Sequence, residues 1–74
     1  MTKPTNVTNS IRALRFAHGE MTQAELAERV GVTRQTVIAI EQGRYSPSLE
    51  MAFRIARVFN VSIDQVFQYP EDAP

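Results

Sequence analysis

The side chains best suited to binding a partner lie between residues 34 and 42. At 3.6 residues per turn, five residues of this stretch share one edge of a helix, and Val37, Ile40 and Glu41 share the opposite side. The outer edge, as we call it, consists of Arg34, Gln35, Ile38, Ala39 and Gln42. Because it carries no acidic residue, it suits an approach to a polyanion.

The outer edge has donors and methyl groups that match base edges in DNA. An arginine can donate two hydrogen bonds to guanine O6 and N7, and a glutamine can bond adenine N6 and N7. Arg34 and Gln35 are therefore candidate base readers, and Ile38 and Ala39 could touch thymine methyl groups. On helical spacing alone, the same side chains could equally form ordinary solvated surface.

Residues on either side of the outer edge suit the phosphate backbone. Gln23 is expected in the first turn of the preceding helix, and Thr33 and Thr36 lie where the next helix begins, beside free backbone N–H groups. Arg44 and Tyr45 follow on a loop that could also reach a phosphate, although Tyr45 could instead stack on the loop.

Composition argues against catalytic and metal chemistry. The 74 residues include no Cys and one His, which removes thiolate nucleophiles, disulfides and Cys-based zinc sites. Without a Ser/His/acid arrangement or a Gly-rich phosphate loop, we expect no enzyme, no metal and no cofactor. No apolar run approaches the roughly 20 residues of a membrane span, and residues 1–4 have no apolar core behind them. The expected compartment is the cytoplasm.

The charge is balanced overall but not along the chain. Eight basic and eight acidic residues give a net charge of zero, so the basic composition typical of nucleic-acid binding is absent. Residues 1–45 carry six basic and four acidic residues, however, and residues 46–74 carry two and four. Seven of the eight cations are Arg, whose planar fork suits phosphates and guanine edges. The first half therefore permits a polyanionic partner without requiring one.

Start and stop signals divide the chain into five short helices, which predicts an all-α fold. Residues 22–25 form a capping box, and Gly31 ends the helix that this box opens. Thr33 caps the next helix, which runs to about Gln42 and stops at Gly43. The other helices are expected from Asn9 or Ser10 to Gly19, from Pro47–Ser48 to Asn60, and from a second capping box at Ser62–Gln65 to a point before Pro70.

Short links make these helices cross around one small core. The expected domain spans residues 9–69, with a mobile arm at residues 1–8 and a tail at residues 70–74. The fourth helix should face the core with Leu49, Ala52, Ile55, Ala56 and Phe59.

A core of this size supplies only about 3–5 kcal/mol, so a second copy would help to stabilise it. Val66, Phe67 and Tyr69 offer apolar material for a dimer interface. Phe67 and Tyr69 could also simply complete the core of a monomer.

One long pattern resembles a known family. The pattern runs Thr22-Gln23-x-x-x-Ala27-x-x-x-Gly31-Val32-Thr33-Arg34-Gln35-Thr36-x-x-x-Ile40-Glu41-x-Gly43, and continues through Tyr45-x-Pro47-Ser48-Leu49 and Asn60-Val61-Ser62-Ile63-Asp64-Gln65-Val66-Phe67. It is similar to the helix-turn-helix of the lambda-repressor-like, Cro/xenobiotic-response-element family, including its short stand-alone repressors. The likeness covers roughly residues 9–69.

The resemblance implies a five-helix domain that binds operator DNA as a two-fold dimer. It places Gln23 on the DNA backbone and pairs Arg15 with Glu41. The base-reading positions that it carries over are Arg34, Gln35 and Ala39. The short repressors also imply that the arm around Val7 pairs as a strand with residues 67–69.

One departure from the family pattern is the link Gly19-Glu20-Met21, which is one residue longer than the commonest spacing in the family.

The expected function is a sequence-specific DNA-binding transcriptional regulator that acts as a homodimeric repressor. The alternative is a protein-interaction module on the same fold, such as an antitoxin or a coactivator-like adaptor. We expect no small-molecule effector, because short helices leave no room for a deep pocket and the chain has no effector domain.

Overall fold

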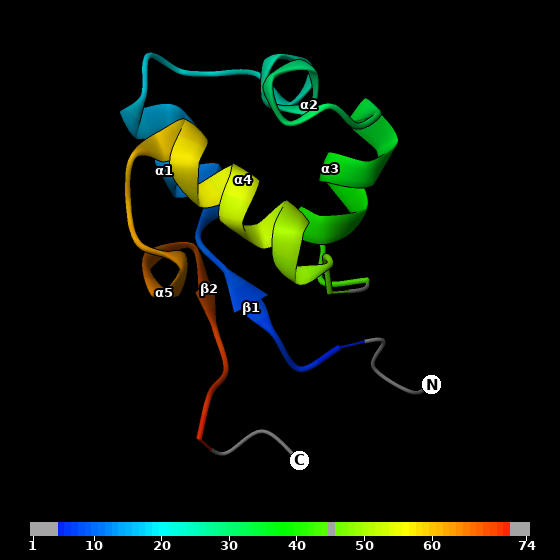
Figure 1. Cartoon of the computed structure of the whole chain (residues 1–74), viewed down its shortest axis with the longest axis vertical. Helices are drawn as coiled ribbons and strands as arrows, with labels where there is room; N and C mark the ends of the chain where they lie inside the picture. The colour runs from blue at the N-terminus through cyan, green and yellow to red at the C-terminus, as the bar shows by residue number, and fades with distance from the viewer. Residues whose placement is uncertain (1–4, 45, 72–74) are drawn as a thin grey trace.

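The computed structural model describes residues 5–44 and 46–71, and this part forms five helices and two short strands (Figure 1). The elements are β1 (Thr8–Asn9), α1 (Ile11–Ala17), α2 (Gln23–Val30), α3 (Arg34–Glu41), α4 (Leu49–Phe59), α5 (Ile63–Val66) and β2 (Phe67–Gln68). The predicted five-helix class with a small strand pairing is confirmed. None of the described helices is long and apolar enough to cross a membrane.

Side-chain caps set where the central helices begin. Thr22 Oγ1 accepts a hydrogen bond from the backbone N–H of Glu25 at 3.0 Å, and Glu25 Oε1 accepts one from the N–H of Thr22 at 3.2 Å. The predicted capping box is therefore formed. Thr33 and Ser48 cap α3 and α4, each accepting from the N–H three residues further on. Each bond satisfies a donor that the first helical turn leaves without a partner.

A left-handed glycine makes the turn between α2 and α3. Gly31 has φ +88°, a conformation that a Cβ disfavours, and its N–H donates to the carbonyl of Ala27 at 2.8 Å. The N–H of Val32 donates to the same carbonyl at 3.0 Å. Ala27 is buried in α2, which packs closely on α3. The small side chain at this position lets the two helices approach each other.

One apolar cluster holds the helices together, and each of the five contributes to it. Its largest fully buried side chains are Ile11, Leu26, Ile55, Phe59 and Val66. From α3 it takes Val37 and Ile40, so α3 is held to the core along one side only.

The prediction that Leu49 faces the core is wrong. Leu49 is 68% exposed, whereas Ala52, Ile55 and Phe59 further along α4 are buried as predicted. Helical spacing does place Leu49 on the same side as these residues. It is the first residue of α4, however, and there the helix extends past the core and meets an open groove instead.

The two strands bring distant parts of the chain together in a small antiparallel sheet (Figure 1). Thr8 pairs with Gln68, and Asn9 pairs with Phe67. Because Phe67 is extended, α5 ends at Val66 and is shorter than expected.

The structure describes only part of the expected arm, residues 1–8, and of the expected tail, residues 70–74. Within the arm, Thr5 Oγ1 lies 2.6 Å from Ser46 Oγ, and Thr8 belongs to β1. Residues 1–4 and 72–74 lie outside the described residues, as does Tyr45.

We predict that Gly31→Ala lowers the free energy of unfolding by about 1–2 kcal/mol, because an L-residue with a Cβ resists positive φ. The nearest atom to an added Cβ is Arg54 Nη1 at 3.9 Å, so the loss reflects backbone conformation and not a clash. Urea unfolding followed by circular dichroism measures it. Gly31→Asn is the control and should lose less, since Asn tolerates the left-handed region. Equal losses in the two variants would contradict this explanation.

Candidate nucleic-acid interface

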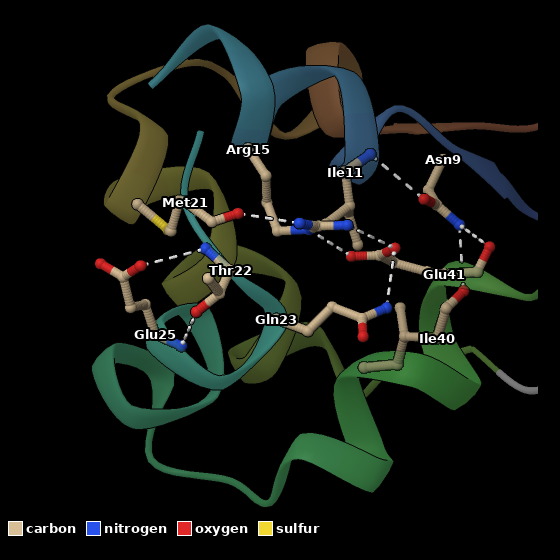
Figure 2. A network of polar contacts seen from close by, with 9 residues as sticks. All are labelled: Asn9, Ile11, Arg15, Met21, Thr22, Gln23, Glu25, Ile40 and Glu41. Carbon is tan, nitrogen blue, oxygen red and sulfur yellow. Dashed lines mark hydrogen bonds and ion pairs between the residues drawn. The ribbon is translucent and has the colours of Figure 1, made fainter. Parts of the chain in front are cut away.

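A buried ion pair joins α1 to the end of α3 (Figure 2). Arg15 Nε donates to Glu41 Oε2 at 2.7 Å, and Arg15 Nη2 donates to Glu41 Oε1 at 3.2 Å. The two side chains are 8% and 9% exposed. These are the two residues that the resemblance pairs, and the longer link between α1 and α2 leaves their contact intact.

The same pair holds the start of α2 in place. Arg15 Nη1 donates to the backbone carbonyl of Met21 at 2.8 Å, and Gln23 Nε2 donates to Glu41 Oε1 at 3.4 Å (Figure 2). Among the described residues, no buried side-chain nitrogen or oxygen lacks a hydrogen-bond partner. The network therefore fixes α1, α2 and α3 relative to one another.

Asn9 anchors the C-terminal end of α3, a role that sequence reasoning missed. Asn9 Nδ2 donates to the carbonyls of Ile40 at 3.0 Å and Glu41 at 3.4 Å, and Asn9 Oδ1 accepts from the N–H of Ile11 at 3.2 Å (Figure 2). The sequence marked Asn9 only as a candidate cap for α1. Its partners on α3 lie 31 and 32 residues away, so no local spacing reveals the contact.

The outer edge lies on the side of α3 that faces away from the core. Arg34, Gln35 and Gln42 are exposed, and Ile38 and Ala39 are half-buried. Within the described residues, the side chains of Arg34, Gln35 and Gln42 make no hydrogen bond or ion pair. Their donors are thus available to a partner.

A hollow of about 640 Å³ lies beside the outer edge, between α1, the start of α2, and α3. The charged residues that line this α1–α3 hollow are Arg12, Arg15, Arg34 and Glu41. Since the one carboxylate is already paired with Arg15, the lining carries a net positive charge that attracts anions. Gln23 also lines the hollow.

The other expected backbone contacts flank α3. The hydroxyl oxygens of Thr33 and Thr36 are 3.0 Å apart, and both residues take part in the cap of α3. Arg44, beyond the other end of α3, is exposed, and its side chain makes no hydrogen bond or ion pair in the described part of the chain. Tyr45, expected beside it, lies outside the described residues.

The three residues expected in a dimer interface have different surroundings. Val66 is fully buried in the core, so it has no surface to offer a second copy, and its assignment to an interface is wrong. The single turn of α5 directs this side chain inward. Phe67 is half-buried against the core, and Tyr69 is 65% exposed.

An apolar groove adjoins Phe67 where the arm, α4 and α5 meet. Its lining consists of Val7, Ser46, Pro47, Leu49, Ala52, Ile63 and Phe67. We call it the terminal groove. Sequence reasoning missed it because Leu49 was assigned to the core, and the groove exists only where segments distant in the chain come together.

These features define a class of protein. Two helices joined by a three-residue turn, with the second helix anchored on one side and bare on the other, form a helix-turn-helix DNA-binding domain. The chain belongs to the helix-turn-helix family of Cro/C1 type, whose members are transcriptional regulators and not enzymes. The family described as Helix-turn-helix matches residues 11–66.

Relatives support this assignment. The chain is 48% identical to an uncharacterised HTH-type transcriptional regulator of Methanocaldococcus jannaschii over 64 residues, which are 86% of this chain and 96% of the relative. It is 34% identical over 59 residues to the cryptic phage CTXphi transcriptional repressor RstR of Vibrio cholerae, covering 80% of this chain and 52% of RstR. A crystal structure of a candidate DNA-binding protein from Bacteroides fragilis superposes with a TM-score of 0.72 at 27% identity, covering 84% of this chain and 98% of that one.

We predict that Arg15→Met or Glu41→Leu alone destabilises the fold by about 3–5 kcal/mol, because each leaves one charge buried without its partner. A loss of this size would unfold much of a domain this small. The double variant should lose much less than the sum of the two, since no unpaired charge remains. Thermal and urea unfolding followed by circular dichroism measure all three.

The control is Glu50→Gln, which removes the exposed Arg54–Glu50 pair. Its side chains are 54% and 76% exposed, so the loss should stay below about 1 kcal/mol. Losses at Arg15 and Glu41 that simply add up in the double variant would show that the pair is not coupled.

Proposed function

We propose that this protein is a sequence-specific repressor that binds a pseudo-palindromic operator as a homodimer, with α3 in the major groove. The observation that carries the proposal is the outer edge, which is free of acidic residues and whose polar side chains are exposed and without partners in the described chain. The major groove admits a helix, and the N-terminal residues of that helix reach the bases. Arg34 and Gln35 are the first two residues of α3.

Ile38 and Ala39 lie one turn further along the outer edge. Both are half-buried, so each keeps some surface that can touch a thymine methyl group or a sugar. Base reading is therefore proposed for the polar start of α3, with apolar contacts from its middle.

The α1–α3 hollow offers a place for the DNA backbone beside the groove. The bond from Gln23 to Glu41 is long, at 3.4 Å, so exchanging it for a phosphate oxygen costs little. We propose further backbone contacts at the two ends of α3, from Thr33 and Thr36 at one end and from Arg44 and Tyr45 at the other.

A second copy of the chain is the proposed occupant of the terminal groove. Leu49 forms its exposed rim beside Phe67, so a two-fold pairing can place each Leu49 in the groove of the other copy. Tyr69, two residues beyond Phe67 and exposed, is proposed as a further contact of this interface. Half-sites read by such a dimer lie about 34 Å apart. A protomer measuring 34 × 23 × 21 Å is compatible with that spacing.

Repression is the proposed outcome of binding. It is supported by RstR, a relative named as a phage transcriptional repressor. We expect operator occupancy to respond to protein concentration through dimerisation, and not to a small-molecule effector.

We predict that Arg34→Ala weakens binding to the preferred duplex by about 1–3 kcal/mol and relaxes specificity at one base pair of each half-site. The duplex is the one that the wild-type chain selects from a randomised pool, and gel shifts on it and on single-base variants measure the effect. Arg57→Ala, on the outer face of α4, is the control and should leave specificity unchanged.

Two results would contradict this assignment. An equal loss on all duplexes would make Arg34 a phosphate contact and not a base reader. Failure of the wild-type chain to select any duplex at dimer-forming concentrations would overturn operator reading and favour a protein-interaction module on this fold.

We predict that Leu49→Glu shifts the protein from dimer to monomer and weakens operator binding at least tenfold, because a charge would enter an apolar interface. Sedimentation velocity measures the oligomeric state. Ala17→Glu places the same charge at an exposed position of α1 outside the terminal groove, and it should leave the dimer intact. A wild-type chain that remains monomeric, or a Leu49→Glu variant that remains dimeric, would refute this interface.

A further inference from the structure

Arg12 and Phe16 form an unusual pair on the outer side of α1. The Cζ atom of Arg12 lies 5.5 Å from the centre of the Phe16 ring, within range for a cation–π interaction. Phe16 is 53% exposed, so its ring is not part of the core. The same ring lies 5.5 Å from the Cζ atom of Arg15, so Phe16 contacts two guanidinium groups of α1, one buried and paired and one exposed.

Arg12 differs from the arginines that have carboxylate partners. Arg15 is paired with Glu41, and Arg54 is paired with Glu50. In the described part of the chain, the guanidinium of Arg12 has no hydrogen bond and no ion pair, and it lies against the Phe16 ring. A ring attracts a cation through its quadrupole without cancelling the charge. Arg12 is therefore held in place with its charge and its donors available.

The position of the pair indicates what it could bind. Arg12 and Phe16 both line the α1–α3 hollow, together with Gln23 and Arg34. They also line a second hollow of about 480 Å³ that continues along α1 past Asn9. Arg12 therefore lies where the two hollows adjoin, on the path that a phosphate backbone bound in the first hollow would follow along α1. The one carboxylate in the first hollow, that of Glu41, is already paired with Arg15.

We propose that Arg12, positioned by Phe16, is a phosphodiester-binding subsite that extends the DNA backbone contact along α1. This inference rests on the proposed function and adds a binding residue and a positioning residue to it. The guanidinium donates to phosphate oxygens in the fork geometry that arginine provides. The ring restricts the arginine before binding, so less side-chain entropy is lost when the phosphate arrives.

The test uses the full chain and the duplex that it selects from a randomised pool, with affinity measured between 50 and 200 mM salt. Arg12→Gln removes one phosphate contact per protomer, so the slope of log affinity against log salt should fall in magnitude by about 2 for a dimer. Phe16→Leu keeps Arg12 but removes the ring, and it should weaken binding about two- to five-fold per protomer. Arg57→Gln, at an exposed position that lines neither hollow, should change neither quantity.

The double variant separates positioning from a direct role of the ring. If Phe16 acts through Arg12, Phe16→Leu should have no further effect in the Arg12→Gln background. Thermal unfolding should show that both single variants remain folded at the assay temperature, as expected for exposed positions.

The inference is overturned if Arg12→Gln retains the wild-type salt slope, or if the effects of the two substitutions simply add. If either result is found while the wild-type chain still binds a duplex selectively, the proposed function is retained and only the Arg12 subsite is rejected. Absence of any selective binding by the wild-type chain would instead remove the proposed function, and this subsite with it.

Discussion

The buried pair of Arg15 and Glu41 is the interaction on which the rest of the structure depends. With about nine-tenths of each side chain withdrawn from water, neither charge has solvent to replace a lost partner. The pair joins α1 to α3, and through the carbonyl of Met21 and the amide of Gln23 it also holds the start of α2. The shape of the α1–α3 hollow follows from this junction. The pair also offsets an acidic charge on a surface otherwise suited to anions.

A helix as short as α3 is not stable by itself, so its position depends on what surrounds it. Thr33 closes its first turn, Val37 and Ile40 bury one side, and Asn9 binds its last carbonyls. None of these contacts uses the polar side chains of the outer edge. The residues that stabilise α3 and the polar side chains of the outer edge therefore lie on different faces of the same helix, and those polar side chains can vary without disturbing the fold.

A net charge of zero means that the protein attracts DNA weakly at long range. In the proposed complex, affinity would come from a few cations placed near one another, and the α1–α3 hollow brings Arg12 and Arg34 together beside the paired Arg15 and Glu41. In the proposed complex, this arrangement would favour specific over non-specific binding, since only a duplex seated on α3 would bring its phosphates to these groups. The local arrangement of charge matters more here than the total.

The sequence by itself determined the elements and the orientation of the outer edge. Caps such as Thr22 and Thr33, the left-handed Gly31 and the 3.6-residue period act within about four residues, so they can be read from the chain. Only the tertiary structure decided that Val66 is buried while Leu49 is exposed, that Asn9 binds α3, and that Arg12 lies beside the hollow. The reason is that the spacing of residues along the sequence predicts which side of a helix a residue occupies. Whether that residue is buried, and what it contacts, depends on which distant segment packs against that side.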